Sequence, residues 1–165
     1  MWAGSVDSEG CVEWRLLPSP LVEPDVAAVE AEFGVRFPPL FRAYLLARLH
    51  LFRDFRSHRH DCTVSLAPMP AGQPLQPLRE LLQAWQPLAD AGLVPFAEWG
   101  DGLGPVCFDS EAQAAEQDFP IVWMDHELLA TLGLEACRQR AAVLPHLQPL
   151  YESYREFLND ILARV

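Results

Sequence analysis

Residues 93–110 constrain the fold of this chain most, because two short apolar runs there flank a glycine-rich segment. That segment is Gly100-Asp101-Gly102-Leu103-Gly104, and Asp-Gly between alternating runs is a strong hairpin signal, since glycine adopts the positive φ that such turns require. Alternation in the first run is expected to separate Val94, Phe96 and Glu98 on one face from Ala97 and Trp99 on the other. We therefore predict an antiparallel hairpin at the centre of a sheet.

The patterns around this hairpin predict an α+β fold. Proline, glycine and capping signals place helices at Pro24–Phe33, from Pro39, around Leu78–Trp85 (ended by Pro87), near Glu135–Ala142 and after a capping box at Ser153–Glu156. Further strands are expected at Cys11–Leu16, Cys62–Leu66 and Phe119–Met124. We expect an antiparallel sheet with an N-terminal helical pair and a C-terminal helix packed on it. Residues 1–165 are expected to form a single domain, with 1–20 as an N-terminal strand or extension.

The composition favours a cytoplasmic protein that needs no cofactor to fold. Half of the residues are hydrophobic, and a chain of 165 residues can bury roughly two thirds of its unfolded surface. No stretch reaches the roughly 18 uncharged apolar residues of a membrane helix, and the first residues lack the pattern of a signal segment. Cys11, Cys62, Cys107 and Cys137 form no Cys-x-x-Cys pair, so free thiols are expected, with two disulfides as the alternative.

The negative charge is concentrated in one part of the sequence. The net charge of −11 comes from 23 acidic residues and 12 arginines, with no lysine. Residues 80–137 contain eleven of the acids and no arginine, whereas the rest of the chain is neutral. These acidic residues have two possible roles. They are either ordinary solvated charges that aid solubility, or an acidic face that attracts a basic partner. Nucleic acid is disfavoured as a partner, because phosphates would be repelled.

Three groups of residues have side chains that could form a chemical site. His58, His60 and Cys62 are potential zinc ligands on a strand, but Arg59 lies between the histidines and a polar strand edge explains them better. Cys107, Asp125 and His126 would suit a thiol enzyme only if the fold brought them together, and Cys107 reads as a core residue. The glycine-rich segment lacks the lysine of a phosphate loop. We therefore expect no catalytic residues, metal or cofactor.

Several motifs resemble the SUKH superfamily, the Smi/Knr group related to yeast regulators of cell-wall glucan synthesis. The similarity lies in the helix–Gly34–Phe37-Pro38–helix opening, the Gly100–Gly104 hairpin, the strand at Phe119–His126 and the closing Ser153–Leu158 helix. It covers about residues 20–163, with Phe37 where leucine is usual. The resemblance implies an α+β domain without catalytic residues that acts, in bacteria, as an immunity protein neutralising a toxin, commonly a nuclease. Eukaryotic members are regulatory scaffolds, which is the alternative function.

We expect the partner to be a basic toxin that docks on an acidic surface and is blocked by occlusion. The expected partner-binding residues are Glu98, Trp99, Asp101 and Asp109, which lie in or beside the central hairpin. Trp99 would serve as an interface anchor if it were exposed, although core packing is its leading reading.

Overall fold

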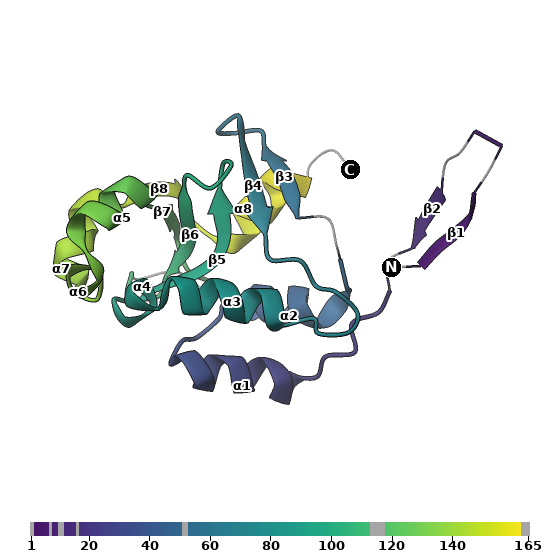
Figure 1. Ribbon diagram of the computed structural model, residues 1–165, viewed down its shortest axis with the longest axis horizontal. Coiled ribbons are helices and arrows are strands. Elements are labelled where there is room, and N and C mark those ends of the chain that lie inside the picture. Colours follow the sequence, from purple (N-terminus) through teal and green to yellow (C-terminus); the bar gives the residue numbers. More distant parts are fainter. Residues whose placement is uncertain are drawn as a thin grey trace.

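A computed structural model of the chain shows a mixed α+β fold built on a six-stranded antiparallel sheet (Figure 1). It describes residues 2–6, 8–9, 12–15, 17–50, 53–112 and 118–162. The strands follow one another across the sheet in chain order: β3 (Asp54–Ser57), β4 (Cys62–Leu66), β5 (Leu93–Trp99), β6 (Gly104–Asp109), β7 (Ile121–Trp123) and β8 (Gln148–Tyr151). The predicted fold class is confirmed, and the predicted hairpin forms the two middle strands.

The predicted N-terminal helical pair and C-terminal helix are also confirmed. The helices are α1 (Glu23–Phe33), α2 (Pro39–Ala47), α3 (Gln76–Ala84), α4 (Gln86–Asp90), α5 (His126–Leu132), α6 (Leu134–Cys137), α7 (Arg140–Val143), a 3-10 turn at Leu144–His146, and α8 (Tyr154–Leu162). Gly34 ends α1 in the left-handed conformation, with φ of 66°. No helix among the described residues is long and apolar enough to cross a membrane.

Two helix predictions were wrong in their boundaries. Pro87 does not end the third helix, which already stops at Ala84; the proline instead lies in the first turn of α4, where no amide donor is lost. The single helix expected near Glu135–Ala142 is divided into α6 and α7. Short helices such as these are held by packing rather than by propensity, so the sequence pattern defines their ends poorly.

One face of the sheet, here called the inner face, packs against an aromatic core. Phe41 of α2 meets the rings of Phe37, Phe96, Phe108 and Tyr154 at centroid distances of 5.2 to 5.7 Å. Helices α1, α2, α3 and α8 all contribute buried side chains to this core. The core therefore joins the N-terminal helices and the closing helix to the middle of the sheet.

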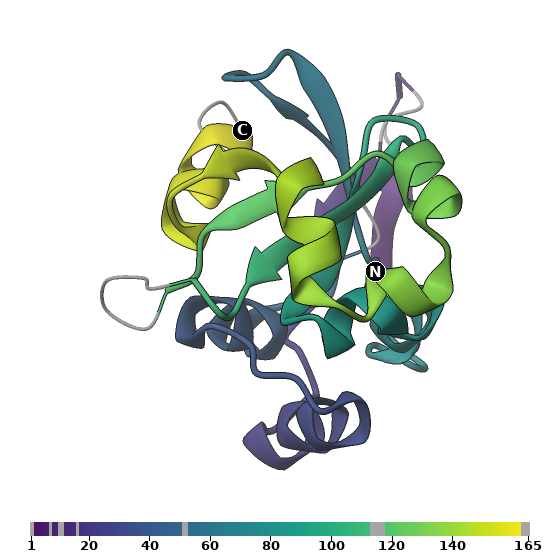
Figure 2. The same ribbon diagram turned by 90° about the vertical axis from the view of Figure 1, so that its left-hand side faces the viewer.

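The opposite, outer face is covered over only part of its area. Cys107 of β6, Leu93 of β5 and Val122 of β7 pack there with Leu88, Leu129 and Val143 from the helices α4, α5 and α7. Figure 2 shows α5–α7 in front of the strands on this side of the molecule. The helical cover leaves the outer face of β3 and β4 to polar side chains.

A register shift in β5 overturns part of the predicted alternation. Pro95 pairs with Cys107 and Ala97 pairs with Val106, so Phe96 is an extra residue in its strand. Such a bulge changes the facing of the residues around it. Val94, Phe96, Ala97 and Trp99 consequently all join the inner core, and the prediction that Ala97 and Trp99 face away from Phe96 was wrong.

The predicted N-terminal strand pairs with a strand that was not predicted. β2 (Val12–Arg15) is antiparallel to β1 (Trp2–Val6), and the two form a separate two-stranded sheet. Figure 1 shows this hairpin apart from the six-stranded sheet. The predictions for Cys11 and Leu16, and for Glu116 in the loop after β6, fall outside the described residues.

Candidate functional site

The four residues predicted to bind a partner do not share one surface. Trp99 is 6 % exposed on the inner face, where its ring stacks on Trp123 with centroids 6.1 Å apart. Asp109 is 5 % exposed, and its carboxylate lies 2.8 Å from the guanidinium of Arg140 on α7. The structure therefore confirms core packing, the leading reading of Trp99, so this residue is not an exposed anchor. It also places Asp109 in the interior, which corrects the expectation that Asp109 faces a partner. Glu98 and Asp101 retain contact with solvent.

The outer face of the sheet carries a polar row across three strands. Asp54 of β3 pairs with Ser65 of β4, and Ser65 pairs with Glu98 of β5. The Ser65 hydroxyl donates a hydrogen bond to Asp54 over 2.6 Å. Directly opposite residues on adjacent strands have neighbouring side chains on the same face. The row therefore brings two carboxylates, from β3 and β5, to the uncovered part of the sheet.

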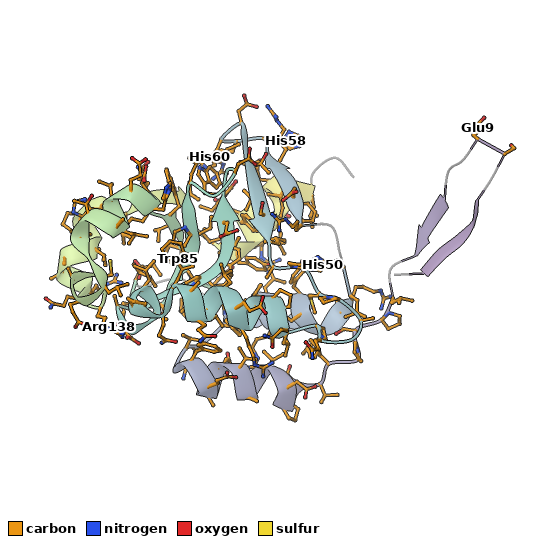
Figure 3. All side chains as sticks on the ribbon, in the orientation of Figure 1. Glu9, His50, His58, His60, Trp85 and Arg138 are labelled. Atoms are coloured by element: carbon orange, nitrogen blue, oxygen red, sulfur yellow. The ribbon has the colours of Figure 1, made fainter. Side chains whose placement is uncertain are left out.

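Glu98 also lies in a groove between this face and the helix α3. The groove has a volume of about 420 Å³, and its walls include Pro77, Leu81 and Trp85, which is labelled in Figure 3. Glu80 of α3 lines the same groove, as does Arg53 at the start of β3. Arg53 forms an ion pair of 3.4 Å with Asp54. We call this feature, defined by Arg53, Ser65, Glu80, Leu81, Trp85 and Glu98, the outer groove.

The Glu98 carboxylate has no protein partner in the outer groove among the described residues. Within the described part of the chain, no hydrogen-bond donor or cation pairs with it, although its residue is only partly exposed. Glu80 accepts a hydrogen bond of 3.0 Å from Gln76 on its own helix. The charged residues that line the groove are the carboxylates of Glu80 and Glu98 and the cation of Arg53, which also pairs with Asp54 outside the lining, so carboxylates outnumber cations. Chemically, the groove is suited to bind a cation.

The turn beside Glu98 holds this arrangement in place. Gly100, Gly102 and Gly104 all have positive φ, as the predicted hairpin turn requires. The amide of Gly100 donates to the carbonyl oxygen of Thr63 over 2.7 Å, and the amide of His126 donates to that of Leu103 over 2.9 Å. The tip of the hairpin, with the exposed Asp101, is therefore anchored to β4 on one side and to α5 on the other.

The acidic residues of segment 80–137 do not form one acidic face. Asp90 and Asp109 are paired with arginines, and Asp118 and Asp125 accept amide hydrogen bonds at the starts of α8 and α5. Carboxylates at these helix ends stabilise the exposed amides and the helix dipole. Much of the negative charge that was expected to face a partner thus has an internal structural role. Near the predicted site, the remaining acidic residues lie in the outer groove and at the hairpin tip.

The predicted zinc-ligand candidates have other surroundings. His58 and His60 lie in the turn between β3 and β4 (Figure 3), and not on a strand as the sequence pattern suggested. A ring nitrogen of His60, Nε2, is 3.1 Å from the carbonyl oxygen of Leu150, and the ring contacts Trp99 edge-on at 5.5 Å. Among the described residues there is no group of three or more potential metal ligands.

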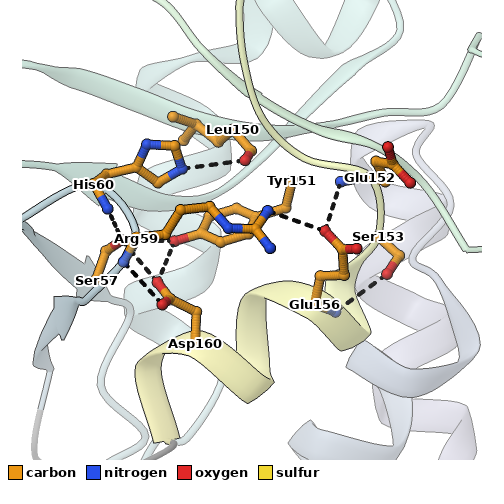
Figure 4. Close-up of polar contacts among 9 residues, drawn as sticks. All are labelled: Ser57, Arg59, His60, Leu150, Tyr151, Glu152, Ser153, Glu156 and Asp160. Carbon is orange, nitrogen blue, oxygen red and sulfur yellow. Dashed lines mark hydrogen bonds and ion pairs between the residues drawn. The ribbon is translucent and has the colours of Figure 1, made fainter.

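A polar network at this turn ties the two edges of the sheet together (Figure 4). Ser57 of β3 and Tyr151 of β8 both donate hydrogen bonds to Asp160 of α8, over 2.8 and 2.7 Å. The amide of Arg59 donates to the same carboxylate over 3.0 Å. Ser57 is fully buried. The network joins the first and last strands of the sheet to each other and to α8, and we assign it a structural role.

The network also changes the predicted capping box at the start of α8. The Ser153 hydroxyl accepts a hydrogen bond of 3.1 Å from the amide of Glu156, which confirms one half of the box. The Glu156 carboxylate, however, lies 3.1 Å from the guanidinium of Arg59 and accepts a 3.4 Å hydrogen bond from the amide of Glu152. In the second half of the box, the Glu156 carboxylate would accept from the amide of Ser153. It instead meets Arg59 and the amide of Glu152, while Asp118 accepts from the amides of Tyr154 and Arg155.

Asp160→Asn is expected to lower the free energy of unfolding by about 1–2 kcal/mol at neutral pH, since three donors lose an ionised acceptor. Burial alone would raise the pKa of Asp160, but the hydrogen bonds from Tyr151, Ser57 and Arg59 outweigh it and lower the pKa. A lowered folded-state pKa means that the ionised carboxylate stabilises the fold above roughly pH 4, the usual aspartate range, and that this stabilisation is lost as the pH falls further.

Urea denaturation of both proteins from pH 7 down to pH 2 measures this effect. The difference between the native chain and Asp160→Asn should shrink at the acidic end. Glu152→Gln removes the same charge from an exposed side chain nearby and should change stability little. A stability difference that stays constant down to pH 2 would contradict the assigned role of the carboxylate.

The thiol candidate is not assembled as a site. Cys107 lies on the outer face of β6, is 3 % exposed and packs in the second core. Burial, with a smaller contribution from Asp109, raises the pKa of this thiol well above its ordinary value. Asp125 caps α5 and the Nδ1 atom of His126 is 2.9 Å from the Leu103 carbonyl oxygen, so both are engaged elsewhere. A buried thiol of high pKa is a poor nucleophile.

The sequence identified Glu98 but missed its neighbours in the groove. Thr63 and Ser65 alternate with buried residues of β4, and this polar alternation is the signal that one face of the strand is open. No sequence signal gave the register that sets Ser65 against Glu98, or the placement of Trp85 beside them. A scan of the chain against protein-family models and a search of curated proteins both found no match.

Proposed function

We propose that this chain is a non-enzymatic protein-binding domain, an immunity protein that neutralises a basic bacterial toxin by covering its functional surface. The resemblance of the sequence to the SUKH superfamily supports this proposal, as does the α+β fold. The observation that carries it is the outer groove, where the partly exposed Glu98 carboxylate has no partner among the described residues. An unpaired carboxylate on a paired strand is well suited to meet a cationic partner, because the backbone that carries it needs no further ordering on binding.

The charge of the chain supports the same partner chemistry. Glu80, Glu98 and Asp101 are near or in the groove and hairpin tip, and the protein as a whole carries a net charge of −11. Such a field accelerates association with a basic protein and weakens binding to an acidic one. The mechanism we propose is occlusion: the acidic surface docks on the basic surface with which the toxin holds its substrate.

The proposal is tested by co-purifying the chain with the product of its neighbouring reading frame. Calorimetry then measures the affinity between the two proteins, and an activity assay measures whether the toxin is inhibited in the complex. The double variant Glu98→Lys/Asp101→Lys should weaken binding by ~100-fold or more, because it places like charges against a basic partner. Glu111→Lys, an exposed substitution beyond the other end of the hairpin, should change affinity less than about threefold.

Two outcomes would contradict the proposal. One is a stable partner that is acidic, or one whose affinity is unchanged by the double variant and by added salt. The other is a complex in which the partner keeps its full activity, which would favour the alternative of a regulatory scaffold.

A further inference from the structure

We propose that the outer groove is a binding site for an arginine side chain presented by the partner, with Glu98 as the anion that receives the guanidinium. The inference rests on the proposed function for the nature of the partner, and it adds the chemistry that the groove selects. It is argued from the charge, lining and setting of the groove.

The charge of the groove favours a cation. Arg53, the cation of the groove, is 60 % exposed and is already paired with Asp54. Glu98 remains without a partner among the described residues, and Glu80 is held only by a neutral amide from Gln76. A partly desolvated carboxylate gains more from a cation than an exposed one, because screening by water is weaker. The groove is therefore complementary to a positively charged group and not to a neutral one.

The shape and lining of the groove favour a guanidinium group. Trp85, partly buried against the second core, lines the same groove as Glu98, together with Pro68 and Pro77. A guanidinium is planar, forms two parallel hydrogen bonds with a carboxylate and lies favourably against an indole ring, whereas an ammonium group is a strongly hydrated point charge. A groove of about 420 Å³ is in the size range of sites for small ligands, so it has room for one such side chain and its stem.

The backbone around the groove is preorganised. Strand pairing on both sides, to Ser65 and to Pro105, fixes the backbone of Glu98. Trp85 is fixed between two helices, with its amide bonded to the Leu81 carbonyl oxygen over 3.2 Å. Groups that are held before the ligand arrives lose little conformational entropy on binding. The fixed backbone of Glu98 and the aromatic wall therefore set the place where the carboxylate can meet a ligand.

The test uses the full chain, labelled with nitrogen-15, and two short capped peptides, Gly-Arg-Gly and Gly-citrulline-Gly. Citrulline has the shape of arginine without its charge. The arginine peptide should shift the indole N–H signal of Trp85 and the amide signal of Glu98 in a saturable manner, and the citrulline peptide should bind at least ~10-fold more weakly. A lysine peptide is expected to bind more weakly than the arginine peptide as well.

The variant Glu98→Gln should weaken binding of the arginine peptide by ~10-fold or more. Glu152 is exposed and lies outside the groove, so Glu152→Gln should leave the affinity for this peptide unchanged. Glu80→Gln changes an exposed helix residue, so this variant should keep its fold and provides a second measurement. It should weaken binding of the arginine peptide by about two- to threefold. Equal binding of the arginine and citrulline peptides, or signal changes that map away from Trp85 and Glu98, would overturn the assignment.

The outcomes also separate this inference from the proposed function. If the chain neutralises a toxin with an affinity that Glu98→Gln leaves unchanged, the groove assignment is wrong and the immunity function stands. If the groove selects arginine but the neighbouring gene product neither binds nor is inhibited, the immunity function is contradicted and the assignment of the groove stands.

Discussion

Gly104→Ala is expected to lower the free energy of unfolding by roughly 3–5 kcal/mol, because it combines backbone strain with a collision that cannot relax. Gly104 has a φ of +152°, and a Cβ atom placed on it would overlap the carbonyl oxygen of Met124 and lie 3.1 Å from the amide nitrogen of His126. Both neighbours are backbone atoms. The strands on either side are fixed by pairing between β6 and β7, so neither chain segment has room to move.

Gly102→Ala is the matched control for this prediction. Gly102 also has a positive φ, of 85°, but a Cβ there would have no neighbour within 4 Å. The loss in free energy of unfolding should be limited to the strain of an alanine in the left-handed conformation, about 1–2 kcal/mol. Urea denaturation of the two variants measures the difference. Equal stabilities would show that the close approach of Gly104 to Met124 does not constrain the fold.

Phe41→Ala is expected to cost about 3–5 kcal/mol, the usual range for removing a buried aromatic ring. Phe41 is 2 % exposed, and its ring contacts aromatic side chains from the sheet and from α8, among them Phe96, Phe108 and Tyr154. The cavity would lie where α2, the sheet and the closing helix meet. Because neighbouring rings are themselves held by several contacts, the space should collapse only partly.

Leu134→Ala provides the comparison, since Leu134 is 70 % exposed and its removal should change stability by less than about 0.5 kcal/mol. Thermal and urea unfolding of both variants, with the outer-groove signals monitored by NMR, check the prediction. A loss for Phe41→Ala below about 1 kcal/mol would mean that the ring is not a centre of the core.

The sequence predicted those parts of the fold that depend on local chemistry. The hairpin followed from Gly100, Asp101 and Gly102, because few side chains tolerate a positive φ. The first helix and its end at Gly34 followed from the same reasoning together with Pro24. Strands β4 and β7 followed from apolar patterning. In each case the signal lies within a few residues of the structure that it predicts.

The candidate site was predicted only in part, for a reason that Trp99 and Glu98 show directly. The sequence placed both near a turn among acids, but the bulge at Phe96 sets which of them faces the core. A shift of one residue in register exchanges the two faces of a strand, and nothing local in the sequence fixes it here. Asp109 was misjudged for a similar reason, since its partner Arg140 lies 31 residues away.

The chain by itself thus determined an α+β fold around a glycine hairpin and an excess of negative charge, because turns, alternation and composition are properties of neighbouring residues. The tertiary structure alone decided which carboxylates remain available to a partner. Arg138 and Arg140 neutralise two of the acids, and two others cap helices, whereas Glu98 is left unpaired beside Trp85 among the described residues. Such pairings depend on contacts between residues distant in sequence, and only folding brings these residues together.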